Sequence, residues 1–218
     1  MITISAFAWV PPFARGLVRD LRVRWALEEA GLAYTTRLLG PLDKETVAYR
    51  ALQPFGQVPI YHEGDFVMFE TGAIVQHIAQ GSPALAPPDA EGRLRMNTWL
   101  FAALNSVEPA LENLFQVDVF FADEGWAKER RPGALAFATK RLQGLAAWLE
   151  GREYLEGERF TAADLMMTTV LRIPRHTDLI ASMPVLDAYV RRCEARPAFQ
   201  RALAAQMASY EEAQAAVA

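Results

Sequence analysis

The sequence predicts a mixed α/β region followed by an all-helical region. The first 80 residues alternate between stretches rich in β-branched and aromatic residues and stretches with helical spacing of apolar residues. The segment "QGSPALAPPDAEG" at 80–92 contains three prolines and two glycines, which is typical of a linker. Beyond it the strand patterns vanish and long helical patterns follow. A chain of 218 residues is long enough to bury a sizeable core in either arrangement.

The first region is predicted to run in the order β-α-β-α-β-β-α. A strand at 2–8 is followed by two prolines, which cannot continue a strand ladder. A helix is predicted from Gly16 to about Ala30, where Leu17, Leu21 and Trp25 recur at four-residue spacing, and Gly31 gives its stop signal. The remaining elements are predicted at 33–39 (strand), 43–52 (helix), 58–62 and 66–69 (a hairpin around "EGD") and 71–79 (helix).

The second region is predicted to contain only helices, at 90–120, 134–150, from Thr161 onward, 184–195 and 197–213. Thr161 and Asp164 form a capping box, which we interpret as structural. The basic cluster "KERR" at 128–131 is interpreted as a solvated loop. The predicted domains are 1–80 and 90–218, joined by a linker at 81–89.

Composition excludes several classes of function. The net charge of −4 argues against a nucleic-acid partner, which would need a basic face, and no apolar run approaches the roughly 18 residues that a membrane crossing needs. Cys193 is the only cysteine, so the chain has no internal disulfide. The three histidines show no metal-ligand spacing, so no metal is expected. No signal-peptide pattern opens the sequence, and the cytoplasm is the expected location.

Four segments resemble one known family. They are "RVRWALEEAGLAY" (22–34), "LQPFGQVPIYHEGDFVMFETGAIVQHIA" (52–79), "ERFTAADLMMTTVL" (158–171) and "RPAFQRAL" (196–203). In this order and spacing they resemble a cytosolic glutathione transferase of the bacterial type, with an N-terminal thioredoxin-like domain and a C-terminal helical domain. The resemblance implies glutathione as co-substrate, no metal cofactor and a homodimer.

The resemblance also implies a glutathione site in this chain. Pro59 would be a cis proline that turns the backbone of Val58 toward the cysteinyl part of glutathione. Glu70 would pair with the γ-glutamyl ammonium, and Thr71 with the carboxylate at the positive end of a helix. Gln57 would reach the glycyl carboxylate. The alternatives are a trans proline on an edge strand, helix capping by Thr71 and an exposed turn residue at 57.

The loop at 8–20 departs from the family pattern. It contains no Tyr, Ser or Cys, whereas most members hold one of these near the end of the first strand. The group that favours the thiolate would then be the N-terminus of the first helix, with Arg15 as the catalytic cation and the Trp9 indole N–H as a further donor. The alternative for Arg15 is a solvated position in a stripe with Arg19 and Arg22.

The implied reaction is attack of the glutathione thiolate on a small apolar electrophile. Trp99, Asn105, Phe115 and Phe120 are the expected wall of the electrophile site, or else core residues. The apolar residues Leu94, Leu100, Phe101 and Leu104 suggest a dimer face on the first long helix. Two other interpretations remain: a non-catalytic binding or regulatory protein, and a cysteine-dependent reductase, which the absence of Cys from the loop disfavours.

Overall fold

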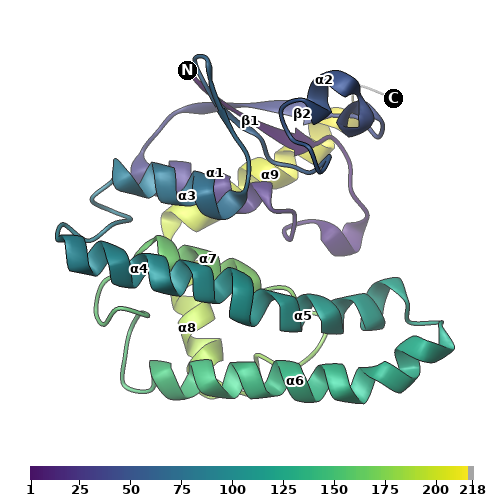
Figure 1. The fold of residues 1–218 in the computed structure, drawn as a ribbon, viewed down its shortest axis with the longest axis vertical. Coiled ribbons are helices and arrows are strands. Elements are labelled where there is room, and N and C mark those ends of the chain that lie inside the picture. The colour runs from purple at the N-terminus through teal and green to yellow at the C-terminus, as the bar shows by residue number, and fades with distance from the viewer. Residues whose placement is uncertain (216–218) are drawn as a thin grey trace. The chain divides into compact units, whose positions relative to one another are not determined.

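The computed structural model describes residues 1–215, which form two compact units (Figure 1). One unit contains Met1–Leu85 together with the chain from Arg196, and the other contains Ala86–Ala195. Each unit is described separately. In the first, a four-stranded sheet and its helices confirm the predicted β-α-β-α-β-β-α order; in the second, every regular element is helical apart from two isolated bridges.

The sheet of the first unit has the strand order β2-β1-β3-β4. The strands are β1 (Ile2–Phe7), β2 (Tyr34–Leu39), β3 (Tyr61–Glu63) and β4 (Phe66–Met68). β1 is parallel to β2 and antiparallel to β3, so Ile4 faces Thr36 on one side and Tyr61 on the other. β3 and β4 form the predicted hairpin, whose turn uses a positive φ of 61° at Gly64.

The helices of this unit are α1 (Asp20–Ala30), α2 (Val47–Arg50), α3 (Thr71–Gln80) and α9 (Pro197–Ala215). α1 begins at Asp20 rather than near Gly16, because a short 3-10 turn (Pro12–Ala14) and a positive φ of 77° at Gly16 interrupt the backbone. α1 ends as predicted at Gly31, which is left-handed with φ 67°.

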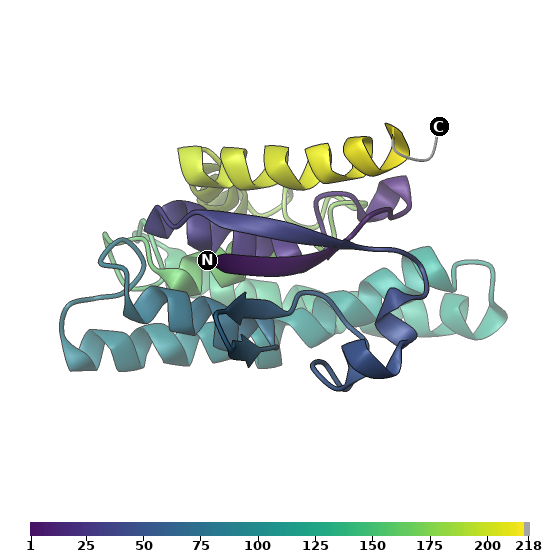
Figure 2. The same ribbon diagram turned by 90° about the horizontal axis from the view of Figure 1, so that it is seen from above.

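α9 packs against α1 within the first unit, as Figures 1 and 2 show. The rings of Trp25 and Phe199 meet edge to face, with centroids 4.8 Å apart. At the other end, Arg24 donates to Asp20 at 2.7 Å and to Ser209 at 3.1 Å. Packing therefore groups α9 with the first unit. The predicted division of the sequence into a domain at 1–80, a linker at 81–89 and a domain at 90–218 stays a proposal.

The second unit contains α4 (Ala90–Ala102), α5 (Glu108–Phe115), α6 (Gly125–Leu149), α7 (Ala162–Leu171) and α8 (Pro184–Glu194). Two π-helical segments, Ala103–Val107 and Gln116–Phe120, continue the long helix that was predicted at 90–120. α6 begins nine residues earlier than predicted, because it accommodates Pro132 within the helix. The "KERR" cluster is thus helical rather than a loop, although its four residues are exposed as expected.

α7 is the buried helix of this unit, and its capping box is confirmed. Asp164 accepts hydrogen bonds from the Thr161 N–H at 2.9 Å and from the Leu155 N–H at 2.8 Å. The Tyr189 hydroxyl donates to the same carboxylate at 3.0 Å. Burial raises the pKa of the Asp164 carboxyl, against these hydrogen bonds, which lower it. Asp164 therefore serves to hold the start of α7 to the preceding loop and to α8.

Candidate functional site

The segment Gln57–Ile60 precedes β3 and contains a cis peptide bond between Val58 and Pro59. Gln57 is exposed, whereas Val58 and Pro59 are buried. Within residues 1–215, neither the N–H nor the C=O of Val58 has a hydrogen-bond partner. Both groups are strong hydrogen-bonding groups that gain stability from a partner. The backbone of Val58 is therefore able to pair with an extended peptide.

The turn before this segment is held firmly. The Gln53 side-chain oxygen accepts from the Phe55 N–H at 2.7 Å, and the Gln53 carbonyl accepts from the Gly56 N–H at 3.0 Å. The ring of Phe55 meets that of Phe69 edge to face, with centroids 6.2 Å apart. Because Phe55 lies two residues before Gln57 and Phe69 one residue before Glu70, this contact brings the segment close to the start of α3.

Glu70 has an unusual backbone conformation at the start of α3. Its φ is 69° and its ψ 111°, and it is the one non-glycine residue with positive φ in the described chain. Such a conformation costs on the order of 1–3 kcal/mol and occurs preferentially at functional sites. The Glu70 carbonyl accepts the first helical hydrogen bond, from Ile74. Its side chain is exposed and makes no capping hydrogen bond.

Thr71 is the first residue of α3 rather than its cap, which corrects the capping interpretation. Its hydroxyl oxygen accepts from Arg22 Nη1 at 3.4 Å. The N–H groups of Thr71, Gly72 and Ala73 precede the first helical hydrogen bond, as is usual at a helix N-terminus. The hydroxyl, these N–H groups and the positive end of the helix together favour an anion at this position.

Arg22 is a residue that sequence reasoning missed. Only 4% of its surface is exposed, so it does not belong to a solvated stripe. It reaches from α1 to Thr71 and adds a full positive charge beside the start of α3. The signal was present in the sequence, because position 22 follows Val18 by four residues and precedes Trp25 by three. Those spacings place Arg22 on the apolar face of α1.

The loop at 8–19 places Arg15 against α9. Its guanidinium carbon lies 5.7 Å from the centroid of the Tyr210 ring, a cation–π contact within the first unit. Trp9, by contrast, is largely exposed. Arg15 is thus partly buried against Tyr210, and it is not an open solvated residue.

The N-terminus of α1 has partners for its first donors. The Leu21 and Arg22 N–H groups donate to the carbonyls of Val18 and Arg19, at 3.0 and 3.1 Å. The buried carboxylate of Asp20 lies in the first turn, where it also accepts from Gln206 at 2.6 Å. Burial raises the pKa of the Asp20 carboxyl, against the lowering effect of Arg24. These two N–H groups are therefore not open donors for a ligand.

The four residues expected to form a wall for an electrophile differ in exposure. Trp99 packs on Trp148 with centroids 5.0 Å apart, and Phe115 is buried against the rings of Phe120 and His176. Asn105 and Phe120 are exposed. Asn105 and Phe120 are thus the most open of this set on the second unit considered by itself, Trp99 is half-buried and Phe115 belongs to the core.

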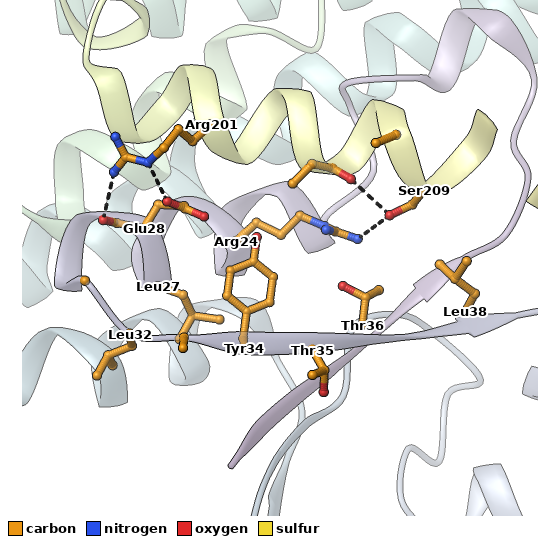
Figure 3. A pocket seen from close by; sticks show the side chains of 14 residues that line it. Arg24, Leu27, Glu28, Leu32, Tyr34, Thr35, Thr36, Leu38, Arg201 and Ser209 are labelled. Atoms are coloured by element: carbon orange, nitrogen blue, oxygen red, sulfur yellow. Dashed lines mark hydrogen bonds and ion pairs between the residues drawn. The ribbon is translucent and has the colours of Figure 1, made fainter. Parts of the chain in front are cut away.

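A pocket of about 810 Å³ lies in the first unit between α1, β2 and α9 (Figure 3). Its lining includes none of the residues at 57–59, 70–71 or 15. Figure 3 shows Arg24 reaching along α9 to Ser209, and Glu28 paired with Arg201 at 2.7 Å. These polar groups already bind one another and hold α9 to α1. We therefore interpret this pocket as a feature of the packing of α9 and not as the ligand site.

The sheet order, the cis proline before β3 and the α3 N-terminus define a thioredoxin-like domain, here followed in the chain by a helical unit. Two sequence profiles match the chain: "Glutathione S-transferase, N-terminal domain" over residues 14–80 and "Glutathione S-transferase, C-terminal domain" over residues 127–197. The chain is 33% identical over 205 residues to glutathione S-transferase 3 of Zea mays, covering 85% of this chain and 88% of that protein. The chain belongs to the glutathione S-transferase family.

Two solved structures extend the comparison. The theta class glutathione S-transferase of Xanthomonas axonopodis pv. citri, solved with glutathione bound, has a TM-score of 0.76 and 30% identity, covering 93% of this chain and 96% of that one. A Burkholderia graminis glutathione transferase, solved with two glutathione molecules per subunit, has a TM-score of 0.81 and 25% identity. The match covers 93% of this chain and 87% of the Burkholderia graminis chain.

The described part of the chain shows neither a metal-binding cluster nor a membrane-crossing helix. Among the described residues, no group of three or more His, Cys, Asp or Glu is arranged to hold a metal ion. None of the helices in residues 1–215 combines the length and the hydropathy that a membrane crossing requires.

Proposed function

We propose that this protein binds glutathione along Gln57–Pro59 and at the start of α3. The observation that carries the proposal is the unpartnered N–H and C=O of Val58, next to a helix start with an anion-favouring character. Val58 pairs with the cysteinyl part of glutathione through both backbone groups. Thr71 and the adjacent N–H groups bind the γ-glutamyl carboxylate, Glu70 binds its ammonium and Gln57 reaches the glycyl carboxylate.

The buried charge of Arg22 supports this orientation of glutathione. A positive charge beside Thr71 favours the carboxylate of the γ-glutamyl group there, while the exposed carboxylate of Glu70 favours the ammonium. The two charges of the zwitterionic end thus meet two protein charges of opposite sign. The glutathione-bound relatives from Xanthomonas axonopodis and Burkholderia graminis support glutathione as the ligand.

The proposed reaction is nucleophilic conjugation. The glutathione thiolate forms a carbon–sulfur bond with a small apolar electrophile, which either loses a leaving group with its electron pair or takes up a proton. A free thiol with a pKa of about 8.5 is roughly 3% ionised at pH 7, so the protein must favour the thiolate. Arg15 is the cation of the 8–19 loop that we assign this role, with Trp9 as a further donor.

The alternative function is a binding or regulatory protein that holds glutathione without catalysis. The loop at 8–20, which contains no Tyr, Ser or Cys, favours this alternative. An ultraviolet titration of bound glutathione distinguishes the two functions. A thiol pKa well below 8.5 supports the transferase, and an unshifted value supports the non-catalytic protein.

Two further properties belong to the proposal. We place the protein in the cytoplasm, and we expect a homodimer whose interface includes the exposed apolar face of α4. Leu94 and Phe101 are 67% and 53% exposed and lie seven residues apart on that helix, whereas Leu100 is 1% exposed and belongs to the core. Two exposed apolar side chains at this spacing lie on one face of the helix.

Calorimetry with glutathione tests the binding site directly. The wild type is expected to bind with micromolar to millimolar affinity. Glu70→Gln keeps the size of the side chain and has the same backbone cost at positive φ, so it isolates the charge. We expect it to weaken binding about tenfold to 100-fold, the usual value of a charge-assisted hydrogen bond. Asp65→Asn, at an exposed residue of the β3–β4 turn, is the matched control and should bind like the wild type. If the wild type gives no heat at about 10 mM glutathione, the proposal is excluded, because any remaining binding would be weaker than the expected micromolar to millimolar affinity.

A further inference from the structure

Three hydrogen bonds connect β1 and α2 to the two ends of the Gln57–Ile60 segment. The Ile60 N–H donates to Ser5 Oγ at 2.7 Å. Ser5 Oγ lies 3.0 Å from the Tyr49 hydroxyl, and that hydroxyl donates to the Gln57 carbonyl at 2.7 Å. Ser5, Tyr49 and Ile60 are all buried. We call these four groups the hydroxyl chain.

The protons of the hydroxyl chain can run in one direction only. Each hydroxyl has one proton to donate. Tyr49 gives its proton to the Gln57 carbonyl, so in the contact between the two hydroxyls Ser5 is the donor. Ser5 in turn accepts from Ile60. The chain therefore runs from the Ile60 N–H through Ser5 and Tyr49 to the Gln57 carbonyl, and hydrogen bonds in such a series strengthen one another.

The hydroxyl chain fixes both ends of the segment and leaves its middle free. Ile60 is held twice, because the Ser5 N–H also donates to the Ile60 carbonyl at 3.0 Å. Tyr49 is itself fixed, since its N–H donates to Thr46 Oγ1 at the start of α2. Between these anchors, Val58 keeps an N–H and a C=O without partners in the described chain. The hydroxyl chain thus sets the position of the two groups that we assign to glutathione.

We propose that Ser5 and Tyr49 are positioning residues for glutathione, which hold the Val58 backbone in the geometry that binds the cysteinyl part of the ligand. This inference rests on the proposed function. Neither residue touches the ligand. A site whose groups are already held in place loses less conformational freedom on binding, and so binds more tightly. Ser5 lies too early to replace the absent hydroxyl of the 8–20 loop, and its buried hydroxyl is committed to this role.

Tyr49→Phe and Ser5→Ala test the inference by calorimetry and by steady-state kinetics. Tyr49→Phe removes one oxygen and keeps the ring, so the packing around it is retained. We expect each variant to raise the Kd and the KM for glutathione about tenfold, with kcat at saturating glutathione unchanged. The double variant should raise the Kd for glutathione no more than about twice as much as either single variant, that is, about 20-fold at most. Breaking one hydrogen bond already interrupts the chain, so the second substitution has little left to remove. Combination of Tyr49→Phe with Glu70→Gln should multiply the two losses, since those residues act on different parts of the ligand.

Tyr61→Phe is the matched control. Tyr61 is a buried tyrosine of β3 whose hydroxyl donates to Glu63 at 2.9 Å, outside the hydroxyl chain. The Tyr61→Phe variant should bind glutathione like the wild type. A purely structural role for Ser5 and Tyr49 predicts lower melting temperatures with the Kd of the folded protein unchanged, and that result would overturn the inference. If Ser5→Ala does not fold, Tyr49→Phe decides alone. A wild type without glutathione binding would instead refute the proposed function and this inference with it.

Discussion

Replacement of Arg22 is expected to weaken glutathione binding through charge alone. Arg22→Gln can still donate to Thr71 Oγ1 but carries no charge. A carboxylate oxygen bound to that hydroxyl at about 2.8 Å would lie about 5 Å from Nη1, which is itself 3.4 Å from Oγ1. Two unit charges at this separation attract by about 3 kcal/mol at an effective dielectric constant of about 20. Delocalisation over the guanidinium reduces this to about 1–3 kcal/mol, so the Kd should rise about 5-fold to 100-fold.

The assay is isothermal calorimetry at low and at physiological salt, with circular dichroism and thermal melting to verify the fold. Arg37→Gln is the control, because Arg37 is an exposed residue of β2 and its loss changes the net charge equally. The rise in Kd caused by Arg22→Gln should change little between low and physiological salt, since a buried charge is screened less than an exposed one. A folded Arg22→Gln variant with a Kd within about twofold of the wild type, or an equal loss in Arg37→Gln, would refute this account of the anion site.

Three other predictions concern catalysis, stability and assembly. Arg15→Ala should raise the thiol pKa of bound glutathione in an ultraviolet titration with the Kd nearly unchanged, and Arg15→Lys should keep part of the effect; equal pKa values in all three proteins would exclude Arg15. Asp164→Ala should lower the free energy of unfolding in urea by about 3 kcal/mol, because it leaves the buried donors of Thr161, Leu155 and Tyr189 without an acceptor. A loss below about 1 kcal/mol would contradict the stabilising role of these hydrogen bonds. Light scattering should give about twice the 24.3 kDa chain mass, and Leu94→Asp with Phe101→Asp should give the single mass; a wild-type monomer would contradict the dimer.

Local patterns were sufficient for most of the first unit. The strands, the Gly31 stop, the hairpin and the start of α3 each depend on a few adjacent residues, and the structure confirms them. The capping box of α7 is equally local. The start of α6 was missed because Pro132 normally ends a helix, whereas here the helix accommodates it.

The partners of the charged residues of α1 could not be assigned from local patterns. Arg22 was considered as a member of a solvated stripe, whereas Asp20, Arg22 and Arg24 are all buried. Their partners, Gln206, Thr71 and Ser209, are distant in the sequence. A buried charge is stable only with such partners, and although the spacing of Arg22 indicated the apolar face of α1, its partner could be identified only from the tertiary fold. The role of Ser5 was hidden for the same reason.

The packing of α9 on α1 has a consequence for synthesis on the ribosome. The first unit contains residues from both parts of the chain, and all of Ala86–Ala195 is made between them. At about 5–20 residues per second, α1, which ends at Ala30, waits roughly 8–34 s for Phe199 of the helix that covers Trp25. During this interval the nascent sheet and α1 exist without their final neighbour, and the second unit emerges complete before the first one can close. The helical unit is thus the first of the two that can finish folding, although the order of the sequence suggests the reverse.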